Sequence, residues 1–158
     1  MKQNVTISFD RFEHWDQLPL NDQELVKRAY EVSKTAYAPY SKFHVGASLR
    51  LSNSEIITGS NQENIAYPSG LCAERVALFY TGANFPNEKI ETLCIVAEGD
   101  LLPIDKILSP CGACRQVMLE TEVRQKKAYR IILVSQNGVT IVFDSAMDLL
   151  PIAFGITD

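Results

Sequence analysis

Residues 92–97 read TLCIVA, and this short apolar run, rich in branched side chains, predicts a buried strand. Downstream, residues 110–112 predict the start of a helix. Residues 129–135 and 139–143 predict two further strands, and the Asn137-Gly138 pair between them predicts a hairpin turn. Strands that alternate with helices in this way predict an α/β fold, a three-layer α/β/α domain around a central mixed sheet.

The sequence on either side of this region predicts further elements. Residues 5–9 alternate apolar and polar side chains and predict an extra strand within an N-terminal extension, residues 1–20. Asn21 followed by Glu24 resembles a capping box, so a helix is expected over residues 22–37. The chain has no repeat or linker, and residues 21–158 are expected to form one domain. The remaining expected elements are a hairpin of residues 43–51 and 55–60, a helix of residues 72–81 capped by Gly82, and a short helix around residues 144–150.

Composition and charge favour a protein that acts on a small molecule. Hydrophobic residues make up 46% of the chain and charged residues 22%, as is typical of globular proteins. The net charge of -4 argues against a nucleic-acid surface, and the basic cluster of Arg124, Lys126 and Lys127 is interpreted as complementing the end of a helix. The N-terminus lacks the apolar stretch of a secretory signal, and apolar runs such as residues 131–134 are too short to span a bilayer. We therefore expect a cytoplasmic protein with neither nucleic-acid nor membrane partners.

Three cysteines stand at the predicted starts of two helices. Residues 72–74 read CAE, and residues 110–114 read PCGAC. Free backbone N–H groups at helix N-termini favour the thiolate form of cysteine, which binds metal. Three thiolates suit zinc, and three protein ligands leave a fourth position for water, as in catalytic zinc sites. Glu74, two positions after Cys72, can lie near the metal without coordinating it and can transfer protons.

Each part of this pattern also has another interpretation. A Cys-x-x-Cys pair occurs in redox sites and structural zinc sites, and a glutamate in the first turn of a helix often only interacts with the helix dipole. A non-catalytic, zinc-stabilised binding module would explain the cysteines but leave Glu74 without a role. Cys94 lies in an apolar strand and is interpreted as a core residue rather than a ligand. The combination matches the described signature of zinc deaminases, in which three cysteines are a permitted variant.

Over most of its length the sequence resembles the cytidine deaminase family. The matching blocks are AYAPYSKFHVGASL (residues 36–49), NQENIAYPSGLCAERVALF (61–79), SPCGACRQVMLE (109–120) and the closing segment DLLPIAF (148–154). The N-terminal extension lies outside this resemblance. The resemblance implies a catalytic domain that converts cytidine and deoxycytidine to uridine and deoxyuridine by hydrolytic deamination, with release of ammonia, as in pyrimidine salvage.

The resemblance also implies the metal chemistry. One zinc ion per subunit would be held by Cys72, Cys111 and Cys114. Glu74 would be the catalytic proton shuttle between a zinc-bound hydroxide and the base. Arg75 would hydrogen-bond the ligand thiolates and offset their negative charge, with a solvated surface arginine as the alternative.

For the substrate, the resemblance implies contacts from several parts of the chain. Phe43 would stack on the pyrimidine, and Asn61 and Glu63 would hydrogen-bond the ribose 3′-hydroxyl. Backbone groups near Ala73 and Ser109 would orient the base. The alternatives are ordinary core packing for Phe43 and a polar turn after a strand for Asn61 and Glu63.

Assembly and substrate class carry their own alternatives. The three-cysteine members of this family usually form homotetramers, and Phe154 would contribute to a neighbouring subunit's pocket or else pack within its own subunit. A deaminase of another aminopyrimidine compound is the nearest rival enzyme, and Asn61 and Glu63 favour the nucleoside. An acidic, compact chain disfavours a nucleic-acid editor.

Overall fold

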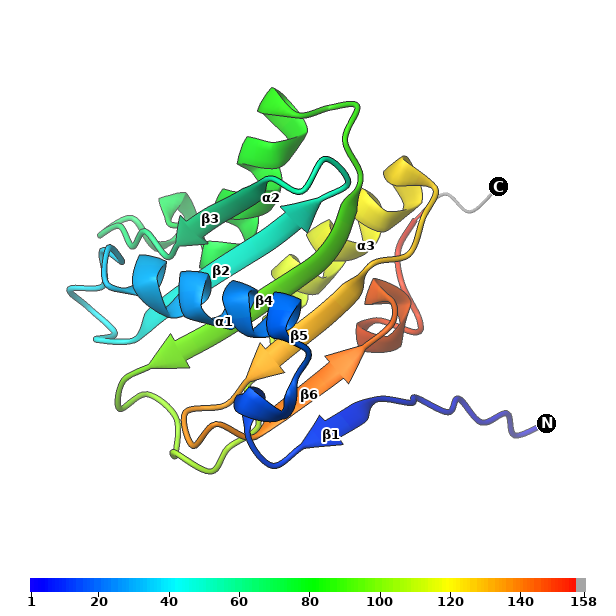
Figure 1. The fold of residues 1–158 in the computed structure, drawn as a ribbon, viewed down its shortest axis with the longest axis horizontal. Coiled ribbons are helices and arrows are strands. Elements are labelled where there is room, and N and C mark those ends of the chain that lie inside the picture. The colour runs from blue at the N-terminus through cyan, green and yellow to red at the C-terminus, as the bar shows by residue number, and fades with distance from the viewer. Residues whose placement is uncertain (156–158) are drawn as a thin grey trace.

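The computed structural model, which describes residues 1–155, contains a six-stranded mixed sheet with helices on both faces. The strand order is β1-β6-β5-β4-β2-β3. Helix α1 crosses one face of the sheet, and α2 and α3 cover the other (Figure 1). The strands are β1 (Asp10–Phe12), β2 (His44–Leu51), β3 (Ile56–Ser60), β4 (Ile90–Glu98), β5 (Arg130–Val134) and β6 (Thr140–Phe143). The helices are α1 (Leu20–Ser33), α2 (Ala73–Asn84) and α3 (Gly112–Gln125), with 3₁₀ turns η1 (Trp15–Gln17), η2 (Tyr67–Ser69) and η3 (Ala146–Leu149).

Strand β4 lies near the centre of the sheet and explains the three-layer arrangement. It pairs antiparallel with β2 and parallel with β5, to which the chain returns through α3. Leu93 and Ile95 point into the core under α2 and α3, while Cys94 and Val96 point into a second core under α1. Because both faces of β4 are covered, its sequence is continuously apolar rather than alternating. The predicted α/β/α fold is confirmed.

The predicted hairpins are also present. β2 pairs antiparallel with β3, and β5 pairs antiparallel with β6. At the β5–β6 turn the Gly138 N–H donates to the Ser135 carbonyl at 2.8 Å. Gly138 has a φ of 87°, a conformation that glycine adopts without strain, as the Asn-Gly signal predicts.

The predicted strand over residues 5–9 is wrong. β1 begins only at Asp10 and pairs antiparallel with β6, from Asp10 opposite Val142 to Phe12 opposite Thr140. β6 ends at Phe143, where the chain turns toward η3, so the residues before Phe9 have no neighbouring strand to pair with in the described part of the chain. Val5 and Ile7 are accordingly exposed.

The limits of α1 also differ from the prediction. Its N-cap is Pro19, which makes no side-chain capping bond, and Asn21 lies inside the first turn. Entry to the helix is fixed instead by Gln23, whose Nε2 donates to the carbonyls of Asp16 and Leu18, both at 2.8 Å. The helix ends at Ser33 rather than at residue 37, because the Tyr37 N–H already donates to the Asn61 carbonyl beyond β3.

The remaining helices begin as predicted but end differently. α2 continues past Gly82 to Asn84 and has Phe85 as its C-cap, so Gly82 is not the cap. A Cβ atom at Gly82 would lie 2.9 Å from the Arg124 guanidinium, so Gly82 allows the α3 side chain to approach α2. The basic cluster lies at the end of α3, where Lys126 is the C-cap. The last predicted helix is the 3₁₀ turn η3. Within residues 1–155, no helix is long and apolar enough to cross a membrane.

Candidate active site

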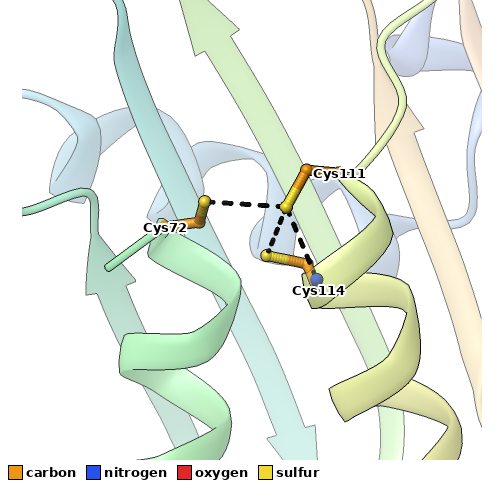
Figure 2. Close-up of side chains that lie close together, drawn as sticks. All are labelled: Cys72, Cys111 and Cys114. Atoms are coloured by element: carbon orange, nitrogen blue, oxygen red, sulfur yellow. Dashed lines mark hydrogen bonds between the residues drawn. The ribbon is translucent and has the colours of Figure 1, made fainter. Parts of the chain in front are cut away.

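The three cysteines of the two motifs come together where α2 and α3 begin. Cys72 is the N-cap of α2, Cys111 is the N-cap of α3, and Cys114 lies in the first turn of α3. The Sγ atoms of Cys72 and Cys111 are 3.9 Å apart, and those of Cys111 and Cys114 are 3.4 Å apart. Figure 2 shows the three side chains converging between the two helix ends. All three sulfur atoms lie within 4.8 Å of one another.

This cluster fits a zinc ion. Tetrahedral zinc with Zn–S bonds of about 2.3 Å places its sulfur ligands roughly 3.8 Å apart, close to the separations found here. Cys114 is buried, whereas Cys111 is exposed, so the cluster is open on one side. Cys94 is fully buried in the core under α1, on the opposite face of the sheet.

The surroundings of the cluster favour a thiolate at Cys72. A hydrogen bond from the Cys114 thiol is the main cause that lowers the Cys72 pKa to about 5; burial opposes this shift, while Arg75 and Cys111 assist it. The same hydrogen bond raises the pKa of Cys114. Arg75 Nη2 donates to the Cys72 sulfur at 3.8 Å. Arg75 is partly exposed, but its Nε is buried and has no hydrogen-bond partner among the described residues.

Glu74 lies in the first turn of α2 and is only 4% exposed. Burial raises the pKa of its carboxyl group to about 7, and the negative charge of Cys72 adds to this effect. A carboxyl group with a pKa near neutrality can both accept and release a proton at physiological pH. Glu74 is therefore a buried titratable group beside the sulfur cluster.

A cavity of about 610 Å³ adjoins the cluster, large enough for a small ligand. It brings together most of the residues that the sequence predicts for substrate or metal, namely Phe43, Asn61, Glu63, Cys72, Glu74, Arg75, Ser109 and Cys111. The side chain of Ala73 is fully buried beside it and is not part of the lining.

Asn61 and Glu63 make defined contacts in the cavity wall. Asn61 Oδ1 accepts from the Val45 N–H and its Nδ2 donates to the Phe43 carbonyl, both at 2.8 Å. Glu63 accepts from the Tyr40 N–H at 2.9 Å, from the Ser41 N–H at 3.3 Å and from the Ser41 hydroxyl. Burial raises the pKa of Glu63, but these hydrogen bonds outweigh it and hold the pKa below its ordinary value.

Phe43 lies between these contacts, at the border of core and cavity. Its side chain is 9% exposed, belongs to the core cluster and also lines the cavity. The core-packing and cavity interpretations therefore both describe its position. The backbone on either side of it is fixed by Asn61, which accepts from Val45 N–H and donates to the carbonyl of Phe43 itself.

Phe154 lies outside the cavity. Its side chain is 90% exposed, so the alternative that it packs within its own subunit is wrong. Its carbonyl oxygen accepts from Gln116 Nε2 at 2.8 Å, which ties the end of the chain to α3.

Sequence reasoning missed several residues of the cavity. Tyr40 and Tyr67 line it and form an edge-to-face pair with ring centroids 6.0 Å apart. Leu101, from the loop between β4 and α3, is 59% exposed and also lines the cavity. Both tyrosines lie within the quoted blocks, but no periodic pattern brings two turns 27 positions apart in sequence together. Only the folded chain shows that they meet.

Comparisons with known proteins show which family the chain belongs to. The family model for the cytidine and deoxycytidylate deaminase zinc-binding region matches residues 19–129. A cytidine deaminase from Halalkalibacterium halodurans is 37% identical over 139 residues, which cover 88% of this chain and 98% of that protein. A cytidine deaminase from Mycobacterium tuberculosis is 31% identical over 136 residues, 82% of this chain and 86% of that protein.

Solved structures extend the likeness to the fold. The crystal structure of a cytidine deaminase from Burkholderia pseudomallei matches with a TM-score of 0.71 and 37% identity, covering 84% of this chain and 98% of that chain. The structure of the Mycobacterium tuberculosis cytidine deaminase matches with a TM-score of 0.61 and 32% identity, over 85% of this chain and 97% of that chain. The chain therefore belongs to the cytidine and deoxycytidylate deaminase family of zinc-dependent hydrolases.

Proposed function

We propose that this protein deaminates cytidine and deoxycytidine by hydrolysis, giving uridine and deoxyuridine and releasing ammonia, in pyrimidine salvage. The observation that supports this most strongly is the buried Glu74 beside a cluster of three cysteine sulfurs, with Glu74, Cys72 and Cys111 lining one cavity. A structural zinc site needs no such carboxyl group. The non-catalytic binding module therefore accounts for less of the geometry than the deaminase does.

The chemistry follows from the two groups together. One zinc ion per subunit, held by Cys72, Cys111 and Cys114, would supply a Lewis acid that lowers the pKa of a coordinated water. Glu74 would take a proton from the attacking water and deliver it to N3 of the pyrimidine, while the water oxygen adds to C4. Glu74 would then transfer the second proton to the amino group, which leaves as ammonia. A Glu74 pKa of about 7 supports both proton transfers.

Substrate recognition is assigned to further residues in and beside the cavity. Phe43 would stack on the pyrimidine, and backbone groups near Ala73 and Ser109 would orient it. Asn61 and Glu63 would bind the ribose 3′-hydroxyl. A carboxylate offers about four acceptor positions, so the three donors already on Glu63 leave one for a sugar hydroxyl. A nucleoside lacking that hydroxyl would leave this acceptor unsatisfied, which disfavours its binding.

Arg75 would offset the negative charge of three thiolates around one divalent ion. Its contact with Cys72 and its buried guanidinium Nε support this assignment. Arg75→Gln is expected to reduce turnover or zinc retention. Unchanged turnover and unchanged zinc content together would refute it.

A homotetramer, with neighbouring subunits closing each cavity, is the proposed assembly. Tyr67 at the cavity is 75% exposed and Phe154 is 90% exposed, and a neighbouring subunit would cover both. Sedimentation that shows a fully active monomer would refute this assembly. The cytoplasmic location stays a prediction from the sequence.

The first test is the loss of cytidine absorbance in the ultraviolet, with protein of measured zinc content. Glu74→Gln keeps the shape of the side chain but cannot transfer protons, so retained zinc with nearly abolished turnover is expected. Glu120→Gln, the same change at an exposed position of α3, is the matched control and should keep full activity. Near-normal turnover of Glu74→Gln would exclude the proton shuttle.

If the wild-type protein holds zinc but leaves cytidine unchanged, the nucleoside is not its substrate. Turnover of another aminopyrimidine compound would then identify the rival enzyme. Absence of turnover with any aminopyrimidine would favour the binding module.

A further inference from the structure

Arg115, in the first turn of α3, makes three hydrogen bonds to two separate segments of the chain. Its Nε donates to the Pro110 carbonyl at 3.0 Å, and its Nη1 donates to the Leu149 carbonyl at 2.9 Å. Its Nη2 donates to the Ser109 hydroxyl. The guanidinium thus links the loop before Cys111 to the C-terminal end of η3.

The position of this cation calls for a specific role. The N-terminal end of a helix carries partial positive charge, so an arginine in the first turn is electrostatically unfavourable. Three charge-assisted hydrogen bonds to oxygen offset that cost at Arg115. Arg124, in the last turn of the same helix, occupies the end where a cation is favourable without such partners.

The bonds from Arg115 act on the residues that lead into the sulfur cluster. Ser109 lines the cavity, and Pro110 immediately precedes the zinc-ligand candidate Cys111. The Leu108 N–H is fixed separately, by donation to Ser135 Oγ at 3.1 Å. Each of the three residues before Cys111 is therefore anchored by a side-chain hydrogen bond, and Arg115 provides two of the three anchors.

The far end of the link is equally well fixed. Glu122 lies seven residues after Arg115, on the same face of α3, and accepts from the Ala146 N–H at 2.8 Å. It also accepts from the Ser145 hydroxyl, which caps η3. α3 thus holds η3 at its start through Glu122 and at its end through Arg115, so the carbonyl that anchors Arg115 is itself held in place.

We propose that Arg115 is a positioning residue for the active site. It sets the path of residues 109–111, and thereby the placement of the Cys111 sulfur and of the Ser109 wall of the cavity. The planar guanidinium reaches three acceptors in fixed directions, which the single ammonium of a lysine on its flexible stem cannot do. This inference rests on the proposed function, because the placement matters for metal and substrate.

The test compares Arg115→Gln, Arg115→Lys and Ser109→Ala with Glu120→Gln, the exposed change on the same helix. Zinc affinity is measured by competition with a chelator, and the thiolate-to-metal absorption of the cobalt(II)-substituted protein reports on the sulfur geometry. Arg115→Gln and Arg115→Lys are both expected to bind zinc roughly 10- to 100-fold more weakly, as changes in groups that orient ligands commonly do. The cobalt spectrum should change, and kcat should fall more than KM rises.

Ser109→Ala removes one contact only and keeps the test valid if an Arg115 variant unfolds. Its effect should be smaller, and it should add little to Arg115→Gln in the double variant, because both changes break the same bond. Zinc affinity, cobalt spectrum and kcat within twofold of wild type in Arg115→Gln would overturn the proposal. If only Arg115→Lys kept the zinc affinity, cobalt spectrum and kcat of the wild type, the role of the guanidinium geometry would be overturned. Zinc binding without deamination by the wild type would refute the proposed function instead, and the affinity comparison would still decide the role of Arg115.

Discussion

Identical side chains in this protein differ sharply in their environment, as the four cysteines show. Burial raises the pKa of the Cys94 thiol, and the charge of Asp22 adds to the shift, so Cys94 is protonated and inaccessible. Cys72 has a pKa of about 5 and is partly exposed. After treatment with a chelator, iodoacetamide should label Cys72 and Cys111 in the folded protein, and should leave Cys94 unmodified.

Peptide mapping by mass spectrometry measures this difference. Zinc should protect the cluster, and denaturation should make Cys94 reactive, which serves as the internal control. Labelling of Cys94 in the folded protein at a rate similar to Cys72 would contradict the structure.

Glu63 leads to a prediction about pH. Its pKa is lowered in the folded protein despite partial burial, chiefly by the Ser41 hydroxyl and by two backbone N–H groups. A lowered pKa stabilises the fold above the ordinary carboxyl pKa of 4.5, and this contribution is lost as pH falls through the folded value. Ser41→Ala should therefore lower the free energy of unfolding more at neutral pH than in acid.

Urea unfolding of the wild type and the variant across this pH range measures that difference. Ser69→Ala, in the exposed turn η2, is the control and should show no such dependence. An equal loss at all pH values would mean that the Ser41 hydroxyl does not interact with the charged form of Glu63.

At the residue level, the sequence was most informative where chemistry restricts the choice of side chain. The three cysteines and Glu74 stand at the starts of two helices, and this pattern predicts a single site. The structure brings these residues together. The contacts of Asn61 and two of the three contacts of Arg115 could not be predicted, because the partners are backbone atoms. A backbone carbonyl leaves no signal in the sequence.

The packing of α1 on β2 gives a prediction at the level of elements. A Cβ atom at Gly46 would overlap the Ala29 carbonyl oxygen and lie 3.0 Å from the Ser33 nitrogen, both in the backbone of α1. A backbone cannot move aside as a flexible side chain does. Gly46→Ala should therefore push α1 away from the sheet and lower the free energy of unfolding by about 1–3 kcal/mol.

Chelator-treated protein unfolded in urea provides the measurement. Gly112→Ala is the matched control, because no atom of residues 1–155 that could clash lies within 4 Å of a Cβ atom at that first position of α3. Alanine favours helix over glycine, so the control should be unchanged or more stable by about 0.5–1 kcal/mol. Gly46→Ala with wild-type stability would show that α1 adjusts freely.

Element limits were predicted well only where local sequence decides them. The buried strand β4 and the Asn-Gly hairpin follow from their own residues. The prediction of a strand over residues 5–9 is wrong because strand pairing requires a partner, and β6 is too short to provide one. The predicted limits of α1 are wrong at both ends because Gln23 and Asn61 bind backbone groups of other segments.

For the whole molecule, the N-terminal extension acts as a cover for the second core. β1 pairs with the outer edge of β6, and Trp15 packs against that core with its ring 6.5 Å from Tyr30. Leu18 is 3% exposed within the same core. His14 lies over the β5–β6 turn, where a Cβ atom at Gly138 would come within 2.7 Å of its Nε2. The matched family region begins at residue 19, so this cover lies outside it.

Two truncations separate the cover from the tail that precedes it. Removing residues 1–9 deletes an exposed segment and should leave the free energy of unfolding nearly unchanged. Removing residues 1–18 deletes Trp15 and Leu18 and exposes the part of the core that they cover. The free energy of unfolding should therefore fall by about 3–5 kcal/mol. This truncation also uncovers the edge of β6, which should promote self-association beyond that of the full chain. Urea unfolding and sedimentation at several concentrations measure both effects.

Zinc content should be equal in the two truncated proteins, because the sulfur cluster lies on the opposite side of the sheet, between α2 and α3 (Figure 2). Equal stability of the two truncations would contradict the assignment of residues 10–18 as a cover, and loss of zinc from the longer truncation alone would show that the two faces of the sheet are coupled.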